Sequence, residues 1–110
     1  MTDALKPIVW VPNSTGHDLS GAEKFGEMKV FHEGPVNVFG SEMPDALTRW
    51  LNKSKKQDYL LLTGAMLANC VAFSHLMNSH GQVKCLIYHQ REKAYRIKTV
   101  YQEELNGQSA

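Results

Sequence analysis

The strongest constraint on the fold is a short apolar strand that turns directly into a long apolar helix. Residues 59–62 form a run of large apolar side chains, typical of a strand buried on both faces. Thr63 and Gly64 then lead into a helix predicted from about residue 65 to 80 and ended by Gly81. Apolar residues surround much of this helix, so we expect it to be covered on two sides, by a sheet and by something else.

The first half of the chain predicts two more strands and two helices. Residues 8–11 are apolar and β-branched, closed by Pro12 and Asn13, and residues 28–32 form the second strand. Between them, Ser20 and Glu23 match a capping box that begins a short helix. A loop carrying Val36, Val38 and Phe39, expected to pack down, then leads to an amphipathic helix with Ser41 as N-cap.

The end of the chain predicts a hairpin, over residues 83–89 and 95–101, with Arg96 and Lys98 facing water. The order β-α-β-α-β-α-β-β predicts a small three-layer α/β domain. Right-handed crossovers give a Rossmann-like, mostly parallel sheet in the order 2-1-3-4-5, with the hairpin strand antiparallel at the edge. We expect one domain over residues 1–102 and a flexible tail over 103–110.

Charge and cysteine content exclude several classes of protein. Twelve basic and eleven acidic residues in 110 leave a net charge of +1, so a nucleic acid is not an expected partner. Cys70 and Cys85 lack metal-type spacing and are interpreted as buried free thiols of a reducing compartment. Residues 1–7 carry an early acid and precede no long apolar segment, which predicts neither a signal peptide nor a membrane span.

Polar residues follow the predicted strands at the edge where open α/β sheets bind ligands. The winding reverses between the first and third strands, and the start of the long helix there suits an anion. These residues predict a site for a phosphorylated or nucleotide-like ligand, without a cofactor, because neither GxGxxG nor Walker A is present. The alternative is that they only satisfy loop amides and allow tight turns. The ligand-binding candidates are Asn13, Ser14, Thr15, Gly16, Asn37, Thr63 and Gly64, and His17 and Asp18 lie in the same region.

His17 and Asp18 are the only adjacent histidine and carboxylate in this region, and such a pair can supply a general base. Adjacent side chains seldom point the same way, however, and Asp18 can instead cap the short helix. We therefore expect a binding protein rather than an enzyme. His75 and His80 are five residues apart, a spacing that does not place two ligands on one helical face, so no metal site is expected.

The hairpin carries basic residues interleaved with aromatic ones, which can bind single-stranded nucleic acid but more often protect a sheet edge. These residues are Arg91, Lys93, Arg96 and Lys98, with Tyr88, Tyr95 and Tyr101. A protein–protein interaction module is the alternative function. The long helix carries more apolar residues than one sheet face can cover, so we expect a homodimer through that helix or the hairpin.

Three stretches, residues 16–18, 33–39 and 59–64, resemble a group of small α/β proteins encoded by bacteriophages. The resemblance covers most of the chain. It implies a soluble protein that acts in the cytoplasm of a bacterial host, and it implies nothing about catalytic residues.

Overall fold

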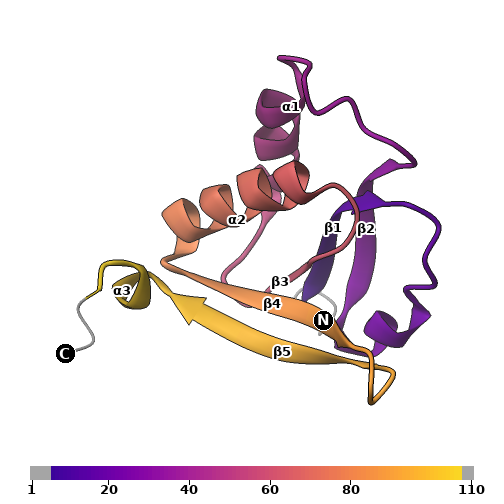
Figure 1. Cartoon of the computed structure of the whole chain (residues 1–110). Helices are drawn as coiled ribbons and strands as arrows, with labels where there is room; N and C mark the ends of the chain where they lie inside the picture. Colours follow the sequence, from indigo (N-terminus) through magenta and orange to yellow (C-terminus); the bar gives the residue numbers. More distant parts are fainter. Residues whose placement is uncertain (1–5, 108–110) are drawn as a thin grey trace.

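The computed structural model describes residues 6–107, and its centre is one five-stranded sheet. The strands are β1 (Ile8–Ser14), β2 (Glu27–Glu33), β3 (Tyr59–Leu61), β4 (Gln82–His89) and β5 (Ala94–Tyr101). Their order is β2-β1-β3-β4-β5; the first four are mutually parallel, and β5 pairs antiparallel with β4 (Figure 1). The predicted order, parallel character and antiparallel edge hairpin are confirmed.

The helices cover the two faces of the sheet unequally. They are η2 (Ser20–Phe25), α1 (Met43–Trp50), η3 (Leu51–Lys53), α2 (Met66–His80) and α3 (Gln102–Leu105), of which η2 and η3 are 3-10 helices. Both longer helices, α1 and α2, lie on one face (Figure 1). The opposite face is covered by η2, and the short helix predicted there is thus a 3-10 helix. The third layer is therefore thin.

Each face of the sheet carries its own core. On the helical face, Trp10 and Leu60 of the sheet meet Leu47 of α1 and Leu76 of α2, all at most 5% exposed. The Trp10 ring meets the Trp50 ring edge-on, with centroids 4.9 Å apart. The opposite face buries Val9, Val11, Ala22, Leu61, Leu86 and Tyr95. Strands β1, β3 and β4 thus bury side chains on both faces, as expected for parallel strands in an α/β sheet.

Strand β1 continues three residues beyond the predicted end at Val11. Pro12 is tolerated because β3 pairs only with Val9 and Trp10, so the β3 side of β1 needs no amide hydrogen there. On the β2 side the pairing continues through Asn13 and Ser14, opposite His32 and Glu33. The expectation that Pro12 and Asn13 close the strand was wrong, because one-sided pairing accommodates proline.

Two predicted helix caps take a different form in the structure. The capping box of Ser20 and Glu23 does not form; η2 has Leu19 at its N-cap without a side-chain hydrogen bond, and the carboxylate of Asp18 accepts the Ser20 amide hydrogen. Ser41 is not the cap of α1 either, because that helix begins at Met43 with Glu42 at the N-cap. The glycine cap of α2 is confirmed, since Gly81 adopts a left-handed conformation with φ +75°.

Two apolar residues expected in the interior lie on the surface. Cys70 is exposed on α2, whereas Cys85 is buried on β4, so the two thiols are not core neighbours. Phe39 is 96% exposed, although Val36 of the same loop packs against the core. The apolar character of these residues predicted burial, but it did not show that their side of the helix or loop faces away from the sheet.

The ends of the chain carry two further expectations. The absence of a signal peptide was inferred partly from residues 1–5, which lie outside the described part, as do residues 108–110. The short helix α3 begins the segment that we expected to be a flexible tail, and the flexibility of that tail stays a prediction. Among the helices of residues 6–107, none is long and apolar enough to cross a membrane.

Candidate functional site

A cleft of about 550 Å³ opens where β1, β3 and β4 end. Because β3 and β4 are parallel, the turn between β4 and β5 lies at the same end of the sheet as the loops that follow β1 and β3. The cleft is therefore bounded by the loop before η2, the loop after β3 and the hairpin turn. Its lining residues are His17, Asp18, Ser20, Gly21, Leu62, Thr63, Tyr88, Lys93, Ala94 and Tyr95.

Of the seven predicted ligand-binding residues, Thr63 lines this cleft, together with the two catalytic candidates, His17 and Asp18. Ser14 lies half-buried at the end of β1, where its carbonyl oxygen accepts the Gly34 amide hydrogen at 2.7 Å. Thr15 and Gly16 are exposed in the following loop and do not line the cleft. The loop after β1 thus contributes two side chains to the cleft, those of His17 and Asp18.

Asn13 and Gly64 have a structural role in the same region. Asn13 is 1% exposed, and its amide group donates to the carbonyl oxygens of His32 (3.1 Å) and Gly34 (2.8 Å). Its Oδ1 accepts the Ala65 amide hydrogen at 2.7 Å, so Asn13 ties β1, β2 and the start of α2 together. A Cβ on Gly64, where φ is +76°, would lie 2.4 Å from that same Oδ1. The geometry of Asn13 and Gly64 therefore agrees with the alternative given above: Asn13 satisfies backbone groups of the loops, and Gly64 allows a tight turn.

Asn37 lies away from the cleft. Its side-chain Oδ1 accepts the Phe39 amide hydrogen at 3.1 Å. It lines a separate, open hollow with His32, Ser41 and Met43, between β2 and α1. The expectation that the loop after β2 joins the ligand site is therefore not met in the structure, because β2 lies at the sheet edge, beyond β1.

Asp18 is committed to the local structure as well as to the cleft. Its Oδ1 accepts the Ser20 amide hydrogen at 3.0 Å, and hydrogen bonds from the Ser20 backbone and side chain lower the pKa of the Asp18 carboxyl. No hydrogen bond between His17 and Asp18 occurs in the described residues. Asp18 is therefore an anion held at the cleft wall by Ser20, and its side chain makes no hydrogen-bonded pair with His17 in this structure.

The sequence interpretation missed seven of the ten lining residues, and four of these belong to the hairpin: Tyr88, Lys93, Ala94 and Tyr95. The rings of Tyr88 and Tyr95 meet at 67° with centroids 5.2 Å apart, and Tyr95 is 8% exposed whereas Tyr88 is 46% exposed. Burial, followed by the charges of Tyr88 and Asp18, raises the pKa of the Tyr95 phenol. Lys93 lies in the turn between β4 and β5. The predicted strand order could have revealed these residues, because it puts the hairpin turn at the carboxyl ends of the parallel strands.

Lys93 has an unusual backbone conformation. Its φ is +53°, the left-handed region that non-glycine residues rarely adopt, and it is the only such non-glycine residue in the described chain. Strained backbone of this kind is often found at functional sites. The cleft thus combines an amine, a fixed carboxylate, the Thr63 side chain and a phenol pair. Among residues 6–107, no group of three histidine, cysteine, aspartate or glutamate side chains could hold a metal ion.

The family model described as Phage Pam3 gp32-like protein matches residues 8–101, from the first residue of β1 to the last residue of β5. This match confirms the resemblance to proteins encoded by bacteriophages. No curated protein and no solved structure matches the chain.

Proposed function

The chain belongs to the Phage Pam3 gp32-like protein family, and we propose that it is a binding protein of the host cytoplasm that takes a phosphorylated, nucleotide-like ligand in the cleft. The observation that carries the proposal is the meeting of Lys93, Thr63 and the Tyr88–Tyr95 pair in one cleft. A cleft of about 550 Å³ lies within the size range of small-molecule sites. We interpret the sheet as Rossmann-like for this purpose, because its winding reverses between β1 and β3.

The tyrosine pair supports recognition of a planar ring. Tyr95 is held by the core and by contact with η2, where a Cβ on Gly21 would lie 3.6 Å from its ring. Tyr88 packs against this anchored ring and remains 46% exposed at the cleft. An aromatic face that is fixed on one side and open on the other suits stacking of a nucleobase.

Lys93 supports recognition of an anionic group. The ammonium group of lysine is a compact charge that binds phosphate well, and a hydroxyl such as that of Thr63 can add a hydrogen bond. The Ala65 amide hydrogen, expected to serve the anion, is occupied by Asn13. Asp18 repels a phosphate, so the phosphate would lie at the Lys93 side, leaving Asp18 to accept hydrogen bonds from a sugar hydroxyl or a ring amine.

Thermal-shift and calorimetric titrations test this proposal. Nucleoside 5′-monophosphates should raise the melting temperature more than the matched nucleosides or inorganic phosphate, because only they use both the ring and the anion contacts. Lys93→Ala should weaken nucleotide binding selectively, and Tyr88→Ala should weaken nucleotides and nucleosides alike. Lys53→Ala, at an exposed lysine of η3 that does not line the cleft, is the control. Failure of every nucleotide to shift the melting temperature would refute the ligand proposal.

Exposed apolar side chains favour a second proposal, that the protein is an interaction module that forms a homodimer or binds a host factor. At the start of α2, Met66 is 78% and Leu67 45% exposed. Leu62, Met66, Cys70 and Phe73 line an apolar hollow of about 430 Å³ beside that helix. Clustered apolar side chains on a surface often mark a protein–protein contact.

A further inference from the structure

Strand β5 presents an open edge along the sheet (Figure 1). Gln102, directly after β5, donates its amide hydrogen to the carbonyl oxygen of Gly81, directly before β4, at 3.1 Å. The amides of the even-numbered residues of β5 therefore face β4. Because alternate residues of an antiparallel pair face the partner strand, the amides of Tyr95, Ile97, Thr99 and Tyr101 point away from β4. Such a row of backbone groups is a template for another strand.

One end of this edge is already closed by the chain itself. The Tyr101 amide hydrogen is donated to Oε1 of Glu104 in α3, at 2.9 Å. No hydrogen bond within the described residues uses the outward amides of Tyr95, Ile97 and Thr99. The edge therefore offers three amides in line, and the contact at Tyr101 shows a carboxylate oxygen already serving as the acceptor on this side.

The helical face of the open edge is basic. Ile87 and Cys85 lie opposite Arg96 and Lys98, and Cys85 packs under α2, so both basic side chains project on the α2 side of the sheet. Five of the 12 basic residues, but only one of the 11 acidic residues, fall between Gln82 and Tyr101. In the described chain, Lys98 has no ion-pair partner.

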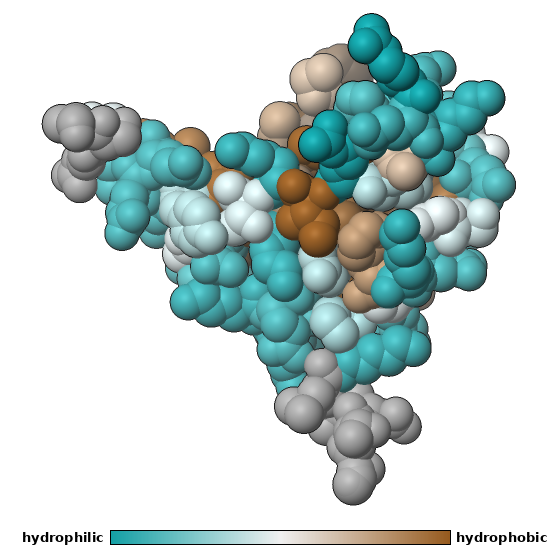
Figure 2. Space-filling model, turned by 90° about the horizontal axis from the view of Figure 1, so that it is seen from below, coloured by the Kyte–Doolittle hydropathy of each residue, from teal (hydrophilic) through white to brown (hydrophobic). Residues whose placement is uncertain are grey.

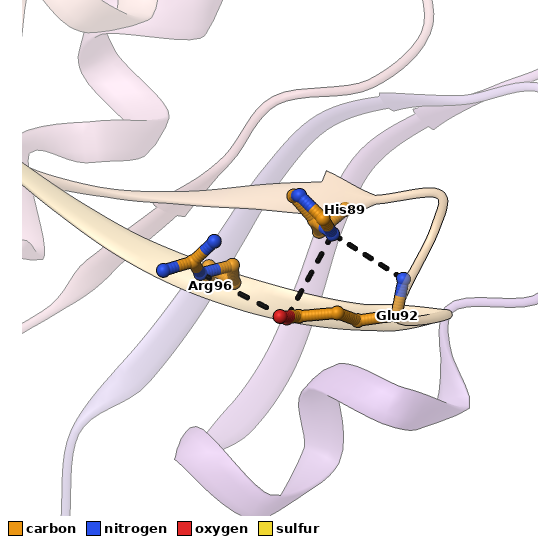
Figure 3. A network of polar contacts seen from close by, with 3 residues as sticks. All are labelled: His89, Glu92 and Arg96. Atoms are coloured by element: carbon orange, nitrogen blue, oxygen red, sulfur yellow. Dashed lines mark hydrogen bonds and ion pairs between the residues drawn. The ribbon is translucent and has the colours of Figure 1, made fainter.

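Arg96 is only loosely paired. Its Nε lies 3.9 Å from Oε1 of Glu92, and the same oxygen lies 3.7 Å from Nδ1 of His89 (Figure 3). The Arg96 and Glu92 side chains are both more than half exposed, so this contact contributes little and leaves the guanidinium group free for another acid.

The opposite face of the edge is apolar. Ile97 is 48% and Tyr101 47% exposed there, because η2 covers only part of this side. Seen from below, an apolar patch lies near the middle of the molecule, with hydrophilic side chains on most sides of it (Figure 2). A strand that pairs with β5 would therefore meet positive charge on one face and apolar surface on the other.

Two other occupants fit this edge less well. Tyr88, Tyr95 and Tyr101 lie on the face opposite Arg96 and Lys98, so basic groups and aromatic rings do not form the shared platform that single-stranded nucleic acid uses. A second copy of β5, paired antiparallel about its middle, would place Arg96 and Lys98 against the same residues of the first. Like charges across a strand pair are unfavourable.

We propose that β5 binds a partner by strand addition, and that the partner is an extended acidic segment whose acidic residues alternate with apolar ones. The segment's backbone pairs with Tyr95, Ile97 and Thr99, its acidic side chains meet Arg96 and Lys98, and its apolar side chains cover Ile97. This surface lies outside the cleft and is independent of the nucleotide proposal and of dimer formation through α2.

A labelled eight-residue peptide that alternates glutamate with valine, measured by fluorescence anisotropy, tests the proposal. It should bind the full chain, and Arg96→Glu with Lys98→Glu should weaken binding about tenfold. Lys53→Glu with Lys56→Glu makes the same charge change on exposed residues elsewhere and should have a smaller effect. Amide hydrogen exchange at Ile97 and Thr99 should slow when the peptide is bound, because strand pairing protects these groups.

Three results would overturn the proposal. A peptide of the same composition with its glutamates in one block keeps the charge but loses the alternation, so equal affinity for it would show that alternating acidic and apolar residues are not recognised. Equal affinity for a peptide with N-methylated alternate amides would exclude backbone pairing. Tighter binding of a single-stranded oligonucleotide of equal charge, with the same dependence on Arg96 and Lys98, would assign the surface to nucleic acid. A melting curve of each variant verifies that it is folded.

Discussion

Oδ2 of Asp58 accepts the indole Nε1 hydrogen of Trp10 at 2.9 Å, joining two residues 48 positions apart. The same carboxylate accepts the amide hydrogens of Ile8 (3.0 Å) and Lys55 (2.8 Å). Asp58 is 8% exposed and directly precedes β3. It thus fixes the start of β1 to the start of β3, at the end of the sheet opposite the cleft.

Removal of this carboxylate should destabilise the protein strongly. We expect Asp58→Ala to lower the free energy of unfolding by about 3 kcal/mol, because it leaves buried donors without an acceptor. Asp58→Asn should not restore stability, since its amide group would face donors at either oxygen position. Urea denaturation measures both. Asp45→Asn, which breaks an exposed ion pair with Arg49, should cost less than about 1 kcal/mol; a similar cost at both sites would contradict this role for Asp58.

Gly64 and Asn13 should be energetically coupled. Gly64→Ala should lower the free energy of unfolding by about 2 kcal/mol, through the positive φ and the collision with Asn13. In an Asn13→Ala background the same substitution should cost less, because the closest atom, Oδ1, is gone, although the Asn13 carbonyl oxygen remains at 2.5 Å. A double-mutant cycle by urea denaturation measures the difference, and strictly additive costs would show that the side chain is not the obstacle.

Substitution of Lys93 by glycine should stabilise the fold and at the same time weaken ligand binding. Lys93→Gly should raise the free energy of unfolding by up to about 1 kcal/mol, because glycine adopts φ +53° without strain. The same substitution should weaken nucleotide binding as much as Lys93→Ala does. Thermal melting and calorimetry of both variants test this, with Lys53→Gly as a control away from the cleft. Unchanged nucleotide affinity in both Lys93 variants would remove the amine from the proposed site.

The two thiols should react at different rates. Cys70 is exposed and should react with a thiol reagent in the folded protein, whereas Cys85 should react only after unfolding. Desolvation raises the pKa of the Cys85 thiol from 9.0 to about 11. Between these values the unfolded chain loses a proton that the folded chain keeps, so stability should fall as pH rises. Cys85→Ala should have a shallower pH dependence between pH 9 and 11 in thermal melts; an equal slope would contradict the assignment.

Self-association remains an expectation, and the structure suggests where to test it. Light scattering with size-exclusion chromatography should give twice 12.4 kDa at micromolar concentration. Met66→Glu should shift the protein to the monomer mass, because it places a charge in the exposed patch at the start of α2. Phe39→Ser, at an exposed apolar residue of another loop, should not. A mass of 12.4 kDa across a tenfold concentration range would rule out the dimer.

The order of the strands could be predicted because local patterns and handedness rules together leave few arrangements. The run at residues 59–62 and the glycine after α2 each fix one element, and right-handed crossovers then decide the neighbours. The length of β1 could not be predicted, because proline is tolerated only where one neighbouring strand is short. That shortness is a property of β3, which lies almost 50 residues away.

The sequence predicted at which end of the sheet the candidate site lies, but it did not predict most of the residues that line it. The end of the sheet and the loops at His17 and Thr63 follow from topology. The role of Asn13 depends on where its side chain points, and its three hydrogen bonds join residues up to 52 positions apart. Tyr88 and Lys93 were interpreted as edge residues because they belong to the hairpin. Their position in the cleft depends on how the hairpin turn packs against the loop before η2.

The shortness of β3 has a consequence for how the molecule deforms. Strands β1 and β2 form one half of the sheet, β4 and β5 the other, and three residues of β3 carry the backbone pairing between them. A line with few hydrogen bonds is the most compliant line of a sheet. The cleft lies at the carboxyl end of this line, with His17 and Asp18 coming from one half and Tyr88 and Lys93 from the other. A small change in the angle between the halves therefore changes the width of the cleft without unfolding either half.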